Sequence, residues 1–134
     1  MKEIKIKTSN EPFSAIEITD IIQKEVDIQN GLVMLYSPCN EVNIFEGELD
    51  EVLPKDYHRT TCDLLRDGRP FVAENGEAYT FNFLHTKEKI IPIKNGEIDL
   101  GRYETYKIQR IFLLDATGCD SERTIWMFNF EEKK

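Results

Sequence analysis

Residues 89–100 read KIIPIKNGEIDL, and this stretch predicts a β-hairpin. Asn95-Gly96 separates two short apolar runs, and both residues tolerate the positive φ angles of a type I′ turn. Because a two-residue turn of this kind joins neighbouring antiparallel strands, the fold is expected to contain an antiparallel sheet.

The sequence on both sides of this hairpin predicts further strands. Residues 2–7 and 13–18 alternate in hydropathy, which is typical of strands with one buried face. Residues 32–36 form a continuous apolar run that favours a central strand covered on both faces, and residues 108–114 predict another buried strand. One face of the final strand is expected to carry Thr124, Trp126, Phe128 and Phe130.

A short helix is predicted after the second of these strands. Thr19-Asp20 is expected to cap its N-terminus, apolar residues follow at helical spacing, and Asn30-Gly31 suits its C-terminal end. Further helical turns are expected at residues 49–53 and 62–66. Two or three short helices beside many strands predict an α+β fold.

Composition limits the class of protein. The chain has 134 residues, a net charge of −8 and 40% hydrophobic residues, which fits one globular domain over residues 1–134. It contains no run of about 18 apolar residues, and acidic chains bind nucleic acid poorly, so neither a membrane nor a nucleic acid is expected as a partner. Cys39, Cys62 and Cys119 form neither a disulfide framework nor a paired metal motif, and the first residues carry no apolar signal segment. We therefore expect a cytoplasmic protein.

Six short segments stand in a fixed order over nearly the whole chain. They are Ile16-Glu17-Ile18-Thr19-Asp20, Asn30-Gly31-Leu32-Val33, Tyr36-Ser37-Pro38, residues 91–96, Leu100-Gly101 and Arg110-Ile111-Phe112. This ordered set resembles the YjbQ family, whose members are often labelled secondary thiamine-phosphate synthases. The resemblance implies a β-sandwich-like core of antiparallel or mixed sheets, and a homotrimer with sites near its subunit interfaces.

Two histidines of the family's motifs are replaced in this chain. Cys39 stands in the family's Pro-His-Thr-Thr segment, and Tyr79 ends its Gly-Asn-x-Asp-Ala-His segment. An imidazole changes its charge near neutral pH, whereas a phenol with a pKa of ~10 stays neutral and a thiol with a pKa of ~8.5 ionises only beside positive charge or metal. The family's activity joins a pyrimidine pyrophosphate to a thiazole phosphate, and here it is expected to be altered or lost.

The resemblance implies a ligand pocket built from residues at the family's motif positions. Its expected catalytic residues are Cys39, Glu46, Asn75, Glu77 and Tyr79, with Arg102 and Arg123 as holders of an anionic group. We expect a small phosphorylated or heterocyclic ligand there, at a subunit interface. Cys39, Glu46 and Glu77 also form a mixed sulfur and oxygen donor set for a metal, but the sequence assigns neither a metal nor a cofactor.

Other interpretations of the same residues stay open. A free cysteine at a strand end is often a small buried apolar residue, and Glu46 and Glu77 are then ordinary solvated acids. In that case the chain is a non-catalytic homotrimeric binding or assembly module on the same scaffold. A third interpretation makes Cys39 a redox or nucleophilic thiol.

Overall fold

The computed structural model describes residues 1–11, 14–48, 87–104, 107–118 and 121–133. Within these ranges the chain forms one short helix and nine strands. In chain order they are β1 (Lys2–Lys7), β2 (Ser14–Glu17), α1 (Thr19–Glu25), β3 (Gly31–Tyr36), β4 (Val42–Glu48), β5 (Glu88–Lys94), β6 (Glu97–Ile98), β7 (Arg102–Glu104), β8 (Lys107–Asp115) and β9 (Glu122–Glu131).

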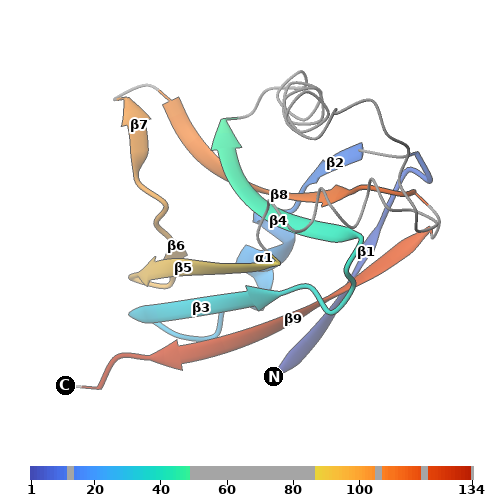
Figure 1. The fold of residues 1–134 in the computed structure, drawn as a ribbon. Helices are drawn as coiled ribbons and strands as arrows, with labels where there is room; N and C mark the ends of the chain where they lie inside the picture. Colours follow the sequence, from blue (N-terminus) through green and yellow to red (C-terminus); the bar gives the residue numbers. More distant parts are fainter. Residues whose placement is uncertain (12–13, 49–86, 105–106, 119–120, 134) are drawn as a thin grey trace, which may run out of the picture.

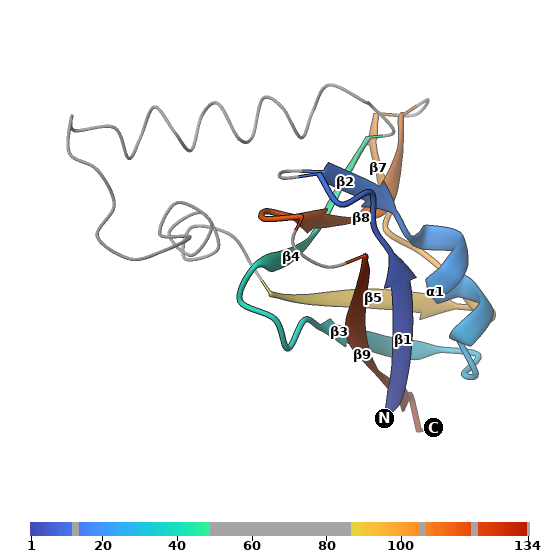
Figure 2. The ribbon, with the colours of Figure 1, turned by 90° about the vertical axis from the view of Figure 1, so that its right-hand side faces the viewer.

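The strands form two sheets that face each other, as Figures 1 and 2 show. The large sheet has the order β1-β9-β3-β5-β6 and lies below the small sheet in Figure 1. The small sheet has the order β2-β8-β4, and β7 pairs with β8 beyond it. All pairings among the described strands are antiparallel, which confirms the predicted α+β fold with antiparallel sheets.

The core lies between the two sheets and consists largely of β-branched and other aliphatic side chains. Those that are fully buried include Val33, Leu35, Ile91, Ile125 and Met127 from the large sheet, and Val42, Ile44, Ile111 and Leu113 from the small sheet. Burying an aliphatic side chain of this size contributes roughly 1.5–3 kcal/mol relative to leaving it in water. This shared apolar layer therefore supplies the main attraction between the sheets.

The central strand β3 is covered on one face, whereas the sequence predicted cover on both faces. Val33 and Leu35 are 0% exposed, but Leu32, which points to the opposite face, is 45% exposed. The second face is the outer side of the large sheet, where Leu32 pairs with Phe130 of β9 and Pro92 of β5. The apolar run thus predicted the strand correctly but the burial of its second face wrongly. A continuous apolar run does not show whether both faces of a strand are covered.

The predicted helix is present, but its cap differs from the prediction. Helix α1 begins at Thr19, the capping position is Ile18, and no side chain caps it. The Thr19 hydroxyl instead accepts a hydrogen bond from the Ile111 N–H at 2.8 Å, next to the bond from the Ile18 N–H to the Ile111 carbonyl. Thr19 therefore continues the pairing with β8 after β2 has ended.

The hairpin at residues 89–100 is confirmed. Asn95 and Gly96 have φ angles of 53° and 79°, and Lys94 pairs with Glu97 across the two-residue turn. The helical turns predicted at residues 49–53 and 62–66 lie outside the described residues. Among the residues described here, no helix has the length and apolar character needed to span a bilayer.

Substitution of Gly31 tests the close contact between β3 and β9. A Cβ atom at Gly31, whose φ is 148°, would lie 2.1 Å from the Phe130 carbonyl oxygen. Because that oxygen belongs to the paired strand, Gly31→Ala is expected to lower the free energy of unfolding by about 3 kcal/mol in urea titrations. Gly101→Ala is the control, since Gly101 also has a positive φ but no atom of the described residues lies within 4 Å of the added Cβ, and it should cost only about 1 kcal/mol. Equal losses for the two variants would contradict this account.

Candidate functional site

A cavity of about 610 Å³ opens where β2 leaves the edge of β8. Strand β2 pairs with β8 only as far as Glu17 opposite Phe112, and the chain then turns into α1. The edge of β8 at Gln109 and Arg110 is thereby left to line the cavity. The other walls come from α1 and from residues 95–101, which include the turn between β5 and β6.

Gln23 holds the helix and the hairpin walls of this cavity together. Its Nε2 donates to the Gly96 carbonyl at 2.9 Å, and its Oε1 accepts from the Ile98 N–H at 2.9 Å. The Gly96 N–H also donates to the Gln29 carbonyl at 2.8 Å. The two walls are therefore tied to each other by the fold itself, which is typical of a preformed site.

The lining of the cavity is acidic. Asp20, Glu97 and Asp99 supply three carboxylates, against one guanidinium, that of Arg110, among the described lining residues. Arg110 donates through Nε to Glu17 and through Nη2 to Asp20 Oδ1 at 3.2 Å. The hydrogen bond to Glu17, more than any other contact, raises the pKa of Arg110 above its ordinary value. This cation of the described lining is thus already neutralised by neighbouring acids.

The size and charge of the cavity suit a particular chemical class. Small-molecule sites commonly have volumes of about 300–1,000 Å³, and this cavity lies within that range. Its carboxylates attract a positively charged group and repel a phosphate. A positively charged group fits this environment better than a free anion does.

Two of the predicted site residues, Cys39 and Arg123, lie in contact at a different place. Arg123 Nη1 donates to Cys39 Sγ at 3.4 Å, and the Glu41 N–H donates to the same sulfur at 3.4 Å. Arg123 is 5% exposed and makes a bidentate ion pair with Asp115, which is fully buried. Its Nη2 also donates to Glu41 Oε2 at 3.1 Å and to Thr117 Oγ1 at 3.0 Å.

This cluster around Arg123 is a buried ion pair shared by both sheets. Burial alone would lower the pKa of Arg123, but the hydrogen bonds and charge of Asp115 outweigh it, so the pKa lies above its ordinary value. The guanidinium therefore binds carboxylates of its own chain. Its predicted role as a holder of an anionic ligand stays a prediction.

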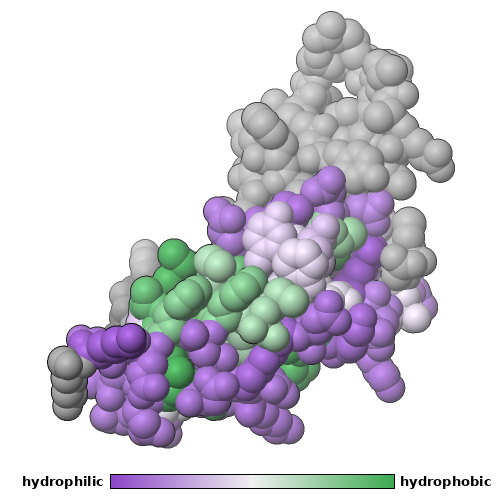
Figure 3. Space-filling view, turned by 90° about the horizontal axis from the view of Figure 1, so that it is seen from below, coloured by the Kyte–Doolittle hydropathy of each residue, from purple (hydrophilic) through white to green (hydrophobic). Residues whose placement is uncertain are grey.

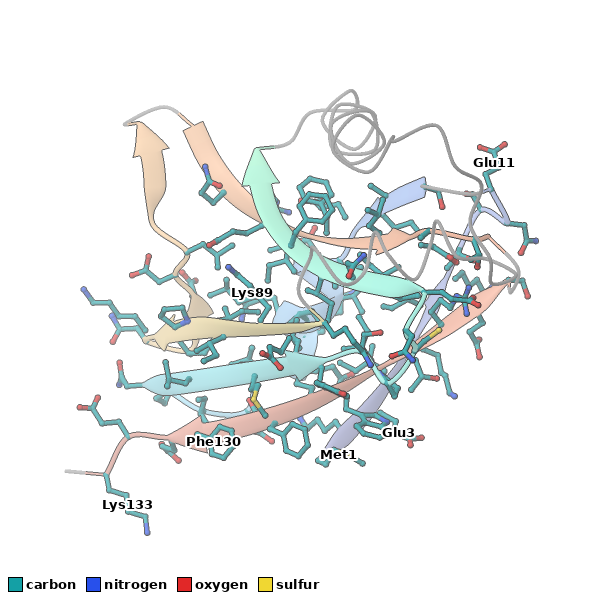
Figure 4. The ribbon with its side chains drawn as sticks, in the orientation of Figure 1. Met1, Glu3, Glu11, Lys89, Phe130 and Lys133 are labelled. Atoms are coloured by element: carbon teal, nitrogen blue, oxygen red, sulfur yellow. The ribbon has the colours of Figure 1, made fainter. Side chains whose placement is uncertain are left out.

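Glu46 lies apart from Cys39, and its partner is Lys89. Glu46 lies four positions after Val42, which corresponds to about 13 Å along β4. Lys89 Nζ donates to Glu46 Oε1 at 2.8 Å between the two sheets, where Figure 4 labels Lys89. The other oxygen, Glu46 Oε2, is buried and accepts no hydrogen bond from the described residues.

Neither Glu46 nor Lys89 lines the cavity, but Glu46 lies one diagonal step across the sheet from a residue that does. Glu46 pairs with Ile111 across β4 and β8, and Gln109, a lining residue, is two positions before Ile111 on the same face. Diagonal neighbours of this kind are about 7–8 Å apart. Sequence reasoning missed Lys89, although its spacing before Ile91 and Ile93 placed a lysine in the inward register of β5.

The remaining predicted residues cannot be placed in this geometry. Arg102 begins β7, and its side chain is not described, while Asn75, Glu77 and Tyr79 lie outside the described residues. Within the described ranges no group of three metal-ligating side chains occurs. The sulfur and oxygen donor set that includes Glu77 is thus untested.

Nearly the whole chain is similar to known proteins. The model of the family described as UPF0047 protein YjbQ-like matches residues 2–132. A UPF0047 protein of Archaeoglobus fulgidus is 25% identical over 127 residues, covering 92% of this chain and 96% of its own. Two crystal structures are similar in fold. A YjbQ/UPF0047 family protein from Clostridium acetobutylicum has a TM-score of 0.80, is 20% identical, and the match covers 97% of this chain and 100% of that one. A hypothetical protein from Aeropyrum pernix K1 has a TM-score of 0.79, is 24% identical, and the match covers 98% of both chains.

The Arg123 cluster is expected to dominate stability at its end of the sheets. Arg123→Met leaves Asp115 as an uncompensated buried charge, so urea unfolding should show a loss of about 3–5 kcal/mol. Lys89→Met removes one partner of a pair whose side chains are 24% and 34% exposed, and it should cost at most about 1 kcal/mol.

A double variant separates charge from packing in this prediction. Arg123→Met combined with Asp115→Asn removes both charges but keeps an acceptor for the Thr117 and Gly118 N–H groups, which donate to Asp115 Oδ1. It should therefore be more stable than Arg123→Met alone. If Arg123→Met cost no more than Lys89→Met, the buried ion pair would not hold the sheets together.

Proposed function

Because this chain belongs to the UPF0047 family of YjbQ-like proteins, we propose that it is a divergent secondary thiamine-phosphate synthase-like protein that binds a small heterocyclic ligand. In this proposal it acts as one domain in a cytoplasmic homotrimer. The observation that carries the proposal is the acid-lined cavity between α1, the β5–β6 turn and the edge of β8.

The charge of the cavity selects between the two ligand classes expected from the sequence. Asp20, Glu97 and Asp99 favour a cationic heterocycle over a phosphorylated one. The same acids would also favour the cation that forms when a pyrimidine pyrophosphate loses its leaving group. The heterocyclic end of the ligand is therefore proposed to face these carboxylates.

Glu46 is proposed to contact this ligand. Its Oε1 is held by Lys89 and its buried Oε2 accepts no bond from the described residues, which supports a role in accepting an N–H from an aminopyrimidine or a similar ring. Cys39 is not proposed to act with Glu46, because its sulfur accepts hydrogen bonds from Arg123 and Glu41 at the other end of β4. The proposal is thus a binding function with altered or lost synthase activity.

A second function, non-catalytic assembly, has separate support. Replacement of both motif histidines by Cys39 and Tyr79 removes the family's expected proton carriers. Leu32 and Ile90 are 45% and 59% exposed on the large sheet, and such apolar exposure is typical of surfaces that bind protein. Under this alternative the homotrimer is the functional unit and the cavity is incidental.

Binding of thiamine tests the ligand class. Thiamine carries an aminopyrimidine and a cationic thiazolium, so it should bind the wild-type protein more tightly than inorganic phosphate in calorimetric titrations at low salt. Asp20→Asn and Asp99→Asn should each weaken thiamine binding by about 2–5-fold, because each removes one partly solvated attraction. Glu122→Gln, on β9, is the control with an equal charge change and should have no effect. Tighter binding of phosphate than of thiamine would rule out this ligand class.

A synthesis assay separates the two functions. The pyrimidine pyrophosphate and the thiazole phosphate are incubated with the protein, with and without divalent metal, and thiamine phosphate is measured by fluorescence after oxidation. We expect a rate at or near the uncatalysed background, since no imidazole stands at either motif position. A rate well above background that Glu46→Gln abolishes would show instead that the family's activity persists with Glu46 in it.

A further inference from the structure

The turn between β5 and β6 is bonded to the segment that contains α1 and the residues after it. The Gly96 N–H donates to the Gln29 carbonyl at 2.8 Å, and the Asn95 N–H donates to Asn30 Oδ1 at 3.2 Å. Gln23 adds two more hydrogen bonds through its side-chain amide. A two-residue hairpin turn closes through the pairing of its own strands, so these four bonds serve to fix the position of the turn relative to α1.

Gln23 differs from the other two residues because it bonds the hairpin on both sides of an acid. Its Nε2 donates to the Gly96 carbonyl and its Oε1 accepts from the Ile98 N–H, both at 2.9 Å, and Glu97 lies between these two residues. A primary amide can donate and accept at once, so this one side chain pairs with the backbone much as a neighbouring strand does. It thereby fixes the place of Glu97 relative to the helix.

The hairpin presents two carboxylates to the cavity. Ile98 packs against the core, and its neighbours along an extended segment point the other way, so Glu97 and Asp99 share the side that faces the cavity. Asp99 is held in place as well. Its N–H donates to the Pro92 carbonyl at 2.9 Å, and its Oδ1 accepts from the Gly101 N–H at 3.2 Å.

The facing wall carries Asp20, which lies on the same helix as Gln23. The two residues are three positions apart on α1, so their side chains are neighbours on one helix face, and both line the cavity. Carboxylates that line one small cavity repel each other, which favours separation of the helix from the hairpin. The hydrogen bonds of Gln23 oppose that separation.

The gathered acids bring no apolar packing to the fold. The lining of the cavity is mainly polar, in contrast to the hydrophobic patch that Figure 3 shows on the underside of the molecule. Asp20, Glu97 and Asp99 are all exposed, so they add repulsion without filling the core. Proteins depart from the arrangement that favours stability mainly at functional sites, which points to a role in binding for this arrangement.

We propose that Gln23 is a positioning residue of the cavity. It holds Glu97 and Asp99 at the distance from Asp20 at which one cationic group contacts acids of both walls. This role rests on the proposed function, which places the cationic part of a ligand among these acids. Gln23 acts through the hairpin and carries no charge of its own. Because the carboxylates are already gathered in the free protein, a cation binds without the cost of ordering them.

Hydrogen exchange measured by NMR tests the hairpin attachment without any ligand. Gln23→Met removes both hydrogen bonds at nearly constant side-chain length, so the Ile98 N–H should exchange about 3–10-fold faster. Gln23→Asn keeps the amide but is one methylene shorter, and it should behave in the same way. The Ser37 N–H, which donates to the Lys87 carbonyl at the far end of β5, is the control and should exchange at an unchanged rate.

Calorimetric titration with thiamine at low salt tests the effect on binding. Gln23→Met should weaken thiamine binding by about 3–10-fold, and this loss cannot come from charge because the substitution is neutral. Gln29→Met is the matched control, since Gln29 bonds the same turn through its backbone carbonyl, and it should bind thiamine as the wild type does.

A double-mutant cycle distinguishes positioning from a merely structural role. When Glu97→Gln and Asp99→Asn are already present, the hairpin has no carboxylate left to position, so adding Gln23→Met should weaken thiamine binding no further. An equal loss in both backgrounds would overturn the positioning role and leave Gln23 as a structural residue.

The remaining outcomes separate this role from the proposed function. Thiamine binding that is equally tight in the wild type and in Gln23→Met would overturn the positioning role alone. Exchange at Ile98 that does not change, or that rises no more than exchange at Ser37, would also overturn it alone, whatever the ligand does. A wild-type protein that binds no thiamine would overturn the proposed ligand class and the positioning role together.

Discussion

The ion pair between Asp115 and Arg123 determines how the two sheets meet. Asp115 ends β8 in the small sheet, and Arg123 lies at the start of β9 in the large sheet. The same carboxylate accepts the N–H groups of Thr117 and Gly118 in the turn between them. The chain passes from the small sheet to the large sheet at this turn. Because β9 pairs with both β1 and β3, the ion pair lies where β9 enters the large sheet.

The contacts of Cys39 show what the residue does at the position of one replaced motif histidine. Its sulfur accepts hydrogen bonds from Arg123 and from the Glu41 backbone, so the residue belongs to the stabilising cluster between the sheets. Glu46 lies toward the other end of β4, where it is partly exposed and pairs with Lys89. The stabilising cluster and the residue proposed to contact a ligand are thus at different ends of the same strand.

Local sequence patterns predicted the strands and the helix, whereas long-range contacts determine how these elements pack and where the cavity lies. Asn95-Gly96 and the alternation of β9 specify their own backbone conformation, so the hairpin and the final strand follow from the sequence. The Thr19 hydroxyl and the Gln23 amide act on residues more than seventy positions away, which no local pattern encodes. For the same reason the cavity was missed, since its walls meet only after the sheets have formed. Both Cys39 and Arg123 were predicted as site residues, but no sequence pattern indicated that they are in contact. Likewise, no pattern indicated the ion pair between Lys89 and Glu46.

Strand β1 has a consequence for the behaviour of the protein at high concentration. It is the outermost of the described strands of the large sheet, and Lys5 and Lys7 lie along it. A free strand edge is a template on which further chains can add and grow into fibres, and closely spaced lysines oppose this by mutual repulsion and by the cost of removing their water. Growth along the hydrogen-bonding direction is therefore resisted, so that concentrated solutions should remain clear instead of forming gels.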